Sequence, residues 1–132
     1  MSYAISTTVD LPVPQAVAAV REALGAQGFG VLSEIDMAAT LKAKIDVDIP
    51  AQVILGACNP PLAHRALGAE ESVGLLLPCN VVVRAAGHGR SVVEAIDPQT
   101  MVSLTGNAGL TDVADEAATR LRAALAALGA TA

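Results

Sequence analysis

The chain contains the segment Leu55–Leu67, LGACNPPLAHRAL, which is followed shortly by Gly74–Val83, GLLLPCNVVV. Both cysteines of the 132-residue sequence, Cys58 and Cys79, lie in these segments. Each cysteine stands within two residues of a proline and is followed directly by asparagine. This repeated Cys-Asn is the most distinctive local chemistry in the sequence, and it indicates where a site should lie.

The residues around these motifs predict how the backbone runs. Gln52–Cys58 reads as a strand, and Asn59 is suited to cap a short helix that starts with prolines and continues to Leu67. Val73–Ala85 is predicted as one long strand or as two strands kinked at Pro78. Because proline cannot donate a hydrogen bond to a neighbouring strand, this segment is expected at an edge or a bulge.

The rest of the chain predicts strands and helices in alternation. Strands are expected at Tyr3–Val9, Phe29–Asp36 and Arg90–Ile96, with a hairpin turn at Gly87–Gly89, and helices at Pro14–Gln27, Met37–Ile45, Asp97–Val102 and Thr111–Leu128, the last ended by Gly129. This order predicts an α+β fold in one domain, residues 1–132. We expect a two-layer sandwich whose mostly antiparallel or mixed sheet is covered by helices on one face.

Composition excludes several classes of partner. The net charge is −5 and aromatic residues make up 2% of the chain, so neither phosphate neutralisation nor base stacking supports nucleic-acid binding. No apolar run is long enough for a membrane span, and the N-terminus lacks the pattern of a signal peptide. We therefore expect a cytoplasmic protein without membrane contact, in which the cysteines are free thiols.

The two motifs predict a ligand-binding site made of Cys58, Asn59, Cys79 and Asn80. We expect the two sulfur atoms to lie within several ångströms of each other at one edge of the sheet. Cys58 is expected to be the more reactive thiol, because free N–H groups of the following helix would stabilise its thiolate. The alternative is that the cysteines are buried as small apolar residues and the asparagines hold turns.

Metal and nucleotide sites find little support in the sequence. Cys58, His64, Cys79 and His88 lack the short spacing of zinc ligands, so no metal site is predicted. There is no Gly-x-Gly-x-x-Gly motif or Walker loop, and no triad from which catalytic residues could be assigned. The sequence names no cofactor.

At the two cysteine motifs the chain resembles a family of bacterial and archaeal proteins known as domain of unknown function 302. The resemblance is carried by Leu55–Pro60 with Leu62, Ala63, Ala66 and Leu67, by Leu76–Val83, and by Ile96–Pro98 with Met101. It runs from the first predicted helix to the last. It implies a compact domain of α and β structure that forms homodimers, and it implies no established reaction.

Three hypotheses about function follow. The first is a homodimeric binding module whose two-cysteine site holds a small ligand, a metal or a sulfur species. The second is a thiol-dependent enzyme or a sulfur carrier that uses Cys58 for covalent chemistry. The third is a non-catalytic structural homodimer with buried cysteines.

Overall fold

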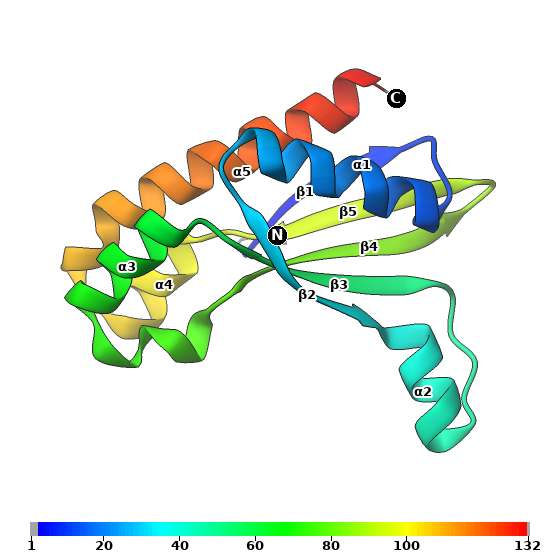
Figure 1. The fold of residues 1–132 in the computed structure, drawn as a ribbon, viewed down its shortest axis with the longest axis horizontal. Helices are drawn as coiled ribbons and strands as arrows, with labels where there is room; N and C mark the ends of the chain where they lie inside the picture. Colours follow the sequence, from blue (N-terminus) through cyan, green and yellow to red (C-terminus); the bar gives the residue numbers. More distant parts are fainter. Residues whose placement is uncertain (1–2, 132) are drawn as a thin grey trace.

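The structure, a computed structural model, describes residues 3–131 and contains a five-stranded sheet with helices packed against it (Figure 1). All neighbouring strands are antiparallel, in the order β1-β5-β4-β3-β2. The strands are β1 (Ala4–Val9), β2 (Gly30–Asp36), β3 (Gln52–Cys58), β4 (Cys79–Gly87) and β5 (Arg90–Ile96). The α-helices are α1 (Val13–Ala26), α2 (Met37–Ile45), α3 (Pro60–Ala69), α4 (Gln99–Thr105) and α5 (Thr111–Thr131), and the 3-10 helices are η1 (Glu71–Leu76) and η2 (Ala108–Leu110).

Helices α1 and α5 lie together on one face of the sheet (Figure 1). The remaining short helices α3, α4, η1 and η2 gather at one end of the sheet, next to the first half of α5. Helix α2 projects from the opposite end, and none of its residues is buried. The prediction of an α+β fold with helices on one face of the sheet is confirmed.

The main core lies between the sheet and helices α1 and α5. Side chains alternate along β3, so Val53, Leu55 and Ala57 point toward the helices. Val20 of α1 and Leu121 of α5 meet them with no solvent exposure. A second, smaller cluster fills the end of the sheet and consists of Leu62, Ala66, Val73, Met101, Leu110, Val113, Ala114 and Ala117. Because α5 contributes to both clusters, it joins the end of the sheet to its centre.

The helix predicted over Met37–Ile45 and the hairpin turn predicted at Gly87–Gly89 are both present. The Asp36 side chain caps α2 by accepting a hydrogen bond from the Ala39 N–H at 2.9 Å. The hairpin between β4 and β5 turns at Gly87–Gly89, where His88 has a φ of 57°. Glycine on both sides supplies the left-handed backbone conformation that this tight turn requires.

The prediction of a strand over Val73–Ala85 is wrong in its first half. Residues Glu71–Leu76 form the 3-10 helix η1, and β4 begins only at Cys79. Val73 is fully buried in the second core cluster, so the apolar run packs onto α3 and α4 instead of extending the sheet. A short apolar run fits either structure, because its periodicity does not distinguish a strand from a short buried helix.

The expected edge position of this segment is also wrong. Strand β4 is the central strand and pairs with both β3 and β5. Pro78 is joined to Leu77 by a cis peptide bond. Because Pro78 lies immediately before β4, it removes no hydrogen bond from the strand ladder. The rule that confines proline to edge strands therefore does not apply at this position.

The helix ends differ from the sequence prediction. Helix α4 continues to Thr105, and α5 runs past Gly129 to Thr131. Glycine lowers helix stability without forbidding it, and Gly129 lies within the last turn. No helix among residues 3–131 is both long enough and apolar enough to cross a bilayer.

Candidate functional site

The junction between β3 and α3 holds the first Cys-Asn motif. β3 ends at Cys58, and Asn59 turns the chain into α3. The Asn59 Oδ1 atom accepts a hydrogen bond from the Leu62 N–H at 3.2 Å, which is the expected helix cap. The Asn59 side chain is buried, and its oxygen atom is already bonded to the backbone of α3. Its role in this structure is therefore to cap the helix.

The second motif is positioned by the pairing of β4 with β3. Cys79 lies directly opposite Ala57 in the register of the two strands. The Pro78 ring lies over Gly56, where an added Cβ would be 2.8 Å from Pro78 Cγ and would also collide with Ser33 Oγ. Glycine at position 56 therefore allows the close approach of Pro78 that brings Cys79 next to the end of β3.

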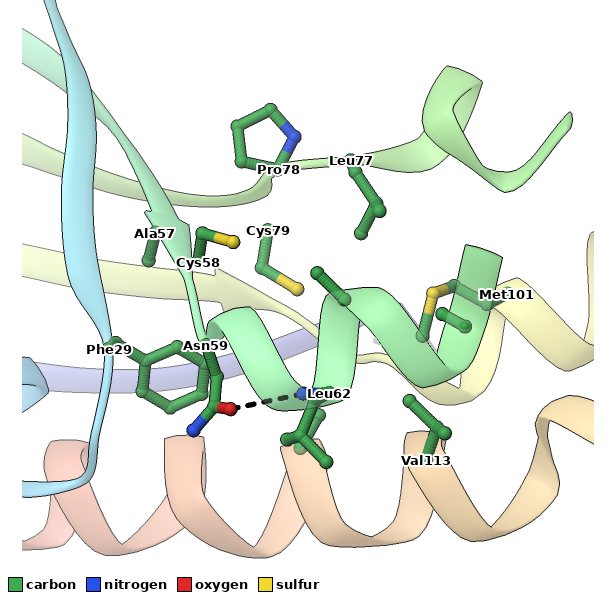
Figure 2. A pocket seen from close by; sticks show the side chains of 13 residues that line it. Phe29, Ala57, Cys58, Asn59, Leu62, Leu77, Pro78, Cys79, Met101 and Val113 are labelled. Carbon is green, nitrogen blue, oxygen red and sulfur yellow. Dashed lines mark hydrogen bonds between the residues drawn. The ribbon is translucent and has the colours of Figure 1, made fainter. Parts of the chain in front are cut away.

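Cys58 and Cys79 line one small pocket at this end of the sheet (Figure 2). Its volume is about 30 Å³, and the two side chains lie side by side between Pro78 and α3. The pocket is otherwise lined by Phe29, Ala57, Asn59, Leu62, Ala63, Ala66, Leu77, Pro78, Met101, Val113 and Ala117. Apart from the thiols and the Asn59 amide, this lining is apolar.

The cysteines lie at the ends of two inner strands, so the predicted position at an edge of the sheet is wrong. Alternation along β3 and β4 puts Cys79 on the helix-covered side with Ala57, and Cys58 on the other side. Both cysteines still line the same pocket, because Cys58 is the last residue of β3 and the pocket lies beyond the strand ends (Figure 2).

The two thiols have different surroundings. Cys79 is buried and Cys58 is partly exposed, and neither forms a disulfide. Burial, and to a smaller extent the charge of Cys58, raises the pKa of the Cys79 thiol from 9.0 to about 11. Cys79 is therefore a protonated thiol at neutral pH, and Cys58 is the thiol with access to solvent.

The start of α3 does not supply the free N–H groups expected near Cys58. Pro60 and Pro61 occupy its first two positions and have no N–H. The Leu62 N–H binds Asn59 Oδ1, and the Ala63 N–H binds the Asn59 carbonyl oxygen at 2.9 Å. The prediction of thiolate stabilisation by this helix start is thus wrong, and no charged side chain lines the pocket.

Ion pairs outside the pocket hold the surrounding helices together. Glu116 of α5 binds Arg65 of α3 at 3.2 Å and Arg120 of its own helix at 3.2 Å. These hydrogen bonds lower the pKa of Glu116. Arg120 Nη1 also donates to the Gln27 carbonyl oxygen at 3.0 Å. Helices α1, α3 and α5 are thereby tied together around Asn59.

The structure separates the other candidate residues from this pocket. Asn80 is exposed and lines a groove of about 620 Å³ on the open face of the sheet. His64 is exposed on α3 and His88 is at the hairpin tip, and neither lines the pocket. Within the described residues, no three His, Cys, Asp or Glu side chains are arranged to hold a metal ion.

Leu77 and Pro78 line both the cysteine pocket and the groove. They form a shared wall between the two spaces. The pocket residues Phe29, Met101 and Val113 come from separate parts of the chain, so no local sequence pattern identifies them or this wall as parts of one site. Gly56 was the one local signal, because a glycine in a strand often marks a close backbone approach.

Comparison with known proteins gives a family but no activity. The family model for the domain of unknown function DUF302 matches residues 5–128. Among solved structures, an uncharacterized conserved DUF302 protein from Bacillus stearothermophilus is 27% identical, with 97% of this chain and 99% of that chain covered and a TM-score of 0.89. No curated protein matches the chain. The chain therefore belongs to the DUF302 family.

Proposed function

We propose that this protein is a homodimeric binding module whose two-cysteine pocket holds a small thiophilic species, either a soft metal ion or a sulfur species. The observation that carries the proposal is that both free thiols line one pocket with almost no other polar group. A pocket that only filled space would not need two thiols in its lining, since aliphatic side chains also fill apolar space.

The residues that line the cysteine pocket limit which classes of ligand it can bind. Phosphate and carboxylate ligands need cationic side chains or free N–H groups, and the pocket presents neither. The volume of about 30 Å³ is too small for a coenzyme. These features favour a neutral or soft species whose affinity comes from bonds to sulfur.

A second candidate is a sulfur carrier or thiol-dependent enzyme that uses Cys58. The partial exposure of Cys58 beside the buried Cys79 favours this candidate, because only Cys58 is open to attack on an incoming molecule. In the carrier reaction, the Cys58 thiolate takes the outer sulfur of a persulfide R–S–SH. Cys58–S–SH forms and R–S⁻ leaves, so atoms and charges balance.

Thiol titration of the folded protein with an aromatic disulfide reagent tests the proposal, together with native mass spectrometry of freshly purified protein. We expect one fast thiol, Cys58, one slow thiol, Cys79, and fast reaction abolished when a bound species is present. Two inert thiols in the folded protein and no added mass would favour a purely structural role for the cysteines.

The proposed dimer contact is the open face of the sheet. Ile54, Val82 and Ile96 lie on this face, and no helix of residues 3–131 covers its middle (Figure 1). Leu75 and Leu104 line the groove there and are 87% and 72% exposed. Exposed apolar patches of this kind mark association surfaces, and a symmetric copy offers a matching one.

Two further expectations belong to the same proposal. Residues 1–132 form one domain, which is supported by α5 contributing to both core clusters. A cytoplasmic location is in keeping with two unpaired cysteines, because thiols stay reduced in that compartment.

A further inference from the structure

The cysteine pocket has the donor set of a site for one soft cation. Its lining contains the thiols of Cys58 and Cys79 and the thioether of Met101, and it contains no carboxylate and no imidazole. Soft sulfur ligands select Cu(I), zinc or iron–sulfur clusters, whereas carboxylates, carbonyls and water suit Mg²⁺ and Ca²⁺. The chemistry of the lining therefore favours a soft ion over a hard one.

The pocket is small. Its volume of about 30 Å³ is far below the roughly 300–1,000 Å³ of typical small-molecule sites. The apolar residues Phe29 and Leu62 close it on the side of the helices. This small size favours a single ion over a large organic ligand.

The number of donors excludes the usual zinc geometry. Structural zinc takes four ligands in a tetrahedron. His64 and His88 are not at the pocket, and the described residues offer no group of three His, Cys, Asp or Glu. Two thiolates satisfy a d¹⁰ monovalent ion, which accepts a linear pair of ligands.

We propose that the pocket binds one soft monovalent d¹⁰ cation of the Cu(I) type between Cys58 Sγ and Cys79 Sγ. The position of both thiols beside each other at the strand ends carries the inference (Figure 2). This inference rests on the proposed function and specifies which ligand the pocket binds. On binding the ion, the two thiols release two protons, and no atom changes its oxidation state. The positive charge of the cation offsets one of the two thiolate charges.

The test uses the full reduced chain under anaerobic conditions, with Cu(I) supplied in competition with bicinchoninate. We expect one Cu(I) per chain, with Zn²⁺ unable to displace it. Cys58→Ser and Cys79→Ala should each weaken binding by more than the ~10–100-fold that loss of an outer-shell partner costs. His64→Ala and His88→Ala serve as matched controls and should leave the affinity unchanged.

Loss of binding in a variant has to be separated from loss of folding, since Cys79 is buried. Thermal unfolding of each variant gives one check. X-ray absorption of the unmodified protein gives a second and should show two sulfur neighbours. Nitrogen or oxygen ligands, or undiminished Cu(I) binding in the Cys58→Ser/Cys79→Ala double variant, would overturn the inference.

Failure of this inference is distinguishable from failure of the proposed function. If Cu(I) does not bind but a polysulfide leaves a trapped sulfur adduct on Cys58, the copper assignment is wrong and the thiophilic pocket stands. If both thiols of the folded protein remain inert to Cu(I), polysulfide and thiol reagents, both proposals fall.

Discussion

The two cysteines share the dipeptide Cys-Asn, but each residue of the repeat has a different environment. Cys79 and Asn59 are buried, whereas Cys58 is partly exposed and Asn80 is exposed. The repeat therefore does not make two equal half-sites. It supplies one accessible thiol, one buried thiol, one helix cap and one amide on the open face of the sheet.

The buried thiol makes stability depend on pH in the alkaline range. The pKa of Cys79 is raised from 9.0 to about 11 in the folded protein, mainly by burial. Between these values the native state keeps its proton while the unfolded state loses it, so stability falls as pH rises, by about 1.4 kcal/mol per pH unit. The stability from this group is fully present below pH 9.0 and lost as pH passes about 11.

Urea unfolding at pH 8, 9, 10 and 11 measures this effect. The Cys79→Ala variant is the control, and its stability should decline less over the same window. Equal declines in the two proteins would contradict the assignment to Cys79.

The two asparagines should respond differently to the same substitution. Asn59→Ala removes the hydrogen bond to the Leu62 N–H and should cost about 1 kcal/mol, as for other helix caps. Asn80→Ala changes an exposed residue and should alter stability by less than about 0.5 kcal/mol. Chemical denaturation measures the stability of both variants. Equal losses of stability would contradict the assignment of the larger effect to the helix cap.

At the scale of the elements, the pocket depends on how closely β4 approaches β3. Pro78 packs over Gly56, and the pairing of Ala57 with Cys79 follows directly. The second core cluster then holds α3, η1 and α4 at the end of the sheet. The site is thus a product of packing between elements that are separate in the sequence.

Gly56→Ala should disturb this packing. The added methyl group would meet Pro78 and Ser33, and overpacking of this kind typically costs about 1–3 kcal/mol. Gly68→Ala is the matched control, because nothing lies within 4 Å of a Cβ at that helical position. Thermal melts should show a lower Tm for the first variant only, together with faster reaction of Cys79 with thiol reagents.

A charge on either buried helix stripe should unfold the protein. Val20 and Leu121 are 0% exposed, so Val20→Asp and Leu121→Asp each bury an unpaired carboxylate at a cost of several kcal/mol. Glu71→Ala changes an exposed residue at the start of η1 and should leave the fold intact. Far-ultraviolet circular dichroism and thermal melts that rank all three variants alike would contradict this reading of the core.

In the molecule as a whole, the helices of residues 3–131 cover one face of the sheet and leave the middle of the other face open (Figure 1). The groove on the other face begins at the wall of Leu77 and Pro78 that also closes the cysteine pocket. In the proposed dimer, the second copy would lie next to the thiol site. The dimer contact and the cysteine pocket would then lie next to each other.

The dimer proposal predicts which apolar residues matter. Leu75→Glu and Leu104→Glu place charges in the groove and should shift the molecular mass by light scattering from dimer to monomer at micromolar concentration. Leu67→Glu changes a residue on α3 that is 45% exposed and lies outside the groove, so the dimer should persist. A monomer mass for the unmodified protein at rising concentration would contradict the proposal.

Features that depend on neighbouring residues follow from the amino-acid sequence alone. The helical pattern of Pro14–Gln27 predicted α1, Gly-His-Gly predicted the hairpin, and Asn59 before two prolines predicted the cap of α3. Each of these signals lies within a few residues along the chain, where local backbone preferences and hydrogen bonds decide the structure.

The positions of the strands in the sheet and the surroundings of the thiols depend on long-range packing. Pro78 suggested an edge strand, yet β4 is central because the proline lies just outside the ladder. Val73 fits a strand locally, but it is buried in η1 against α3 and α4. Strand order and burial depend on contacts between residues far apart in sequence, and the same short apolar run satisfies more than one local structure until those contacts form.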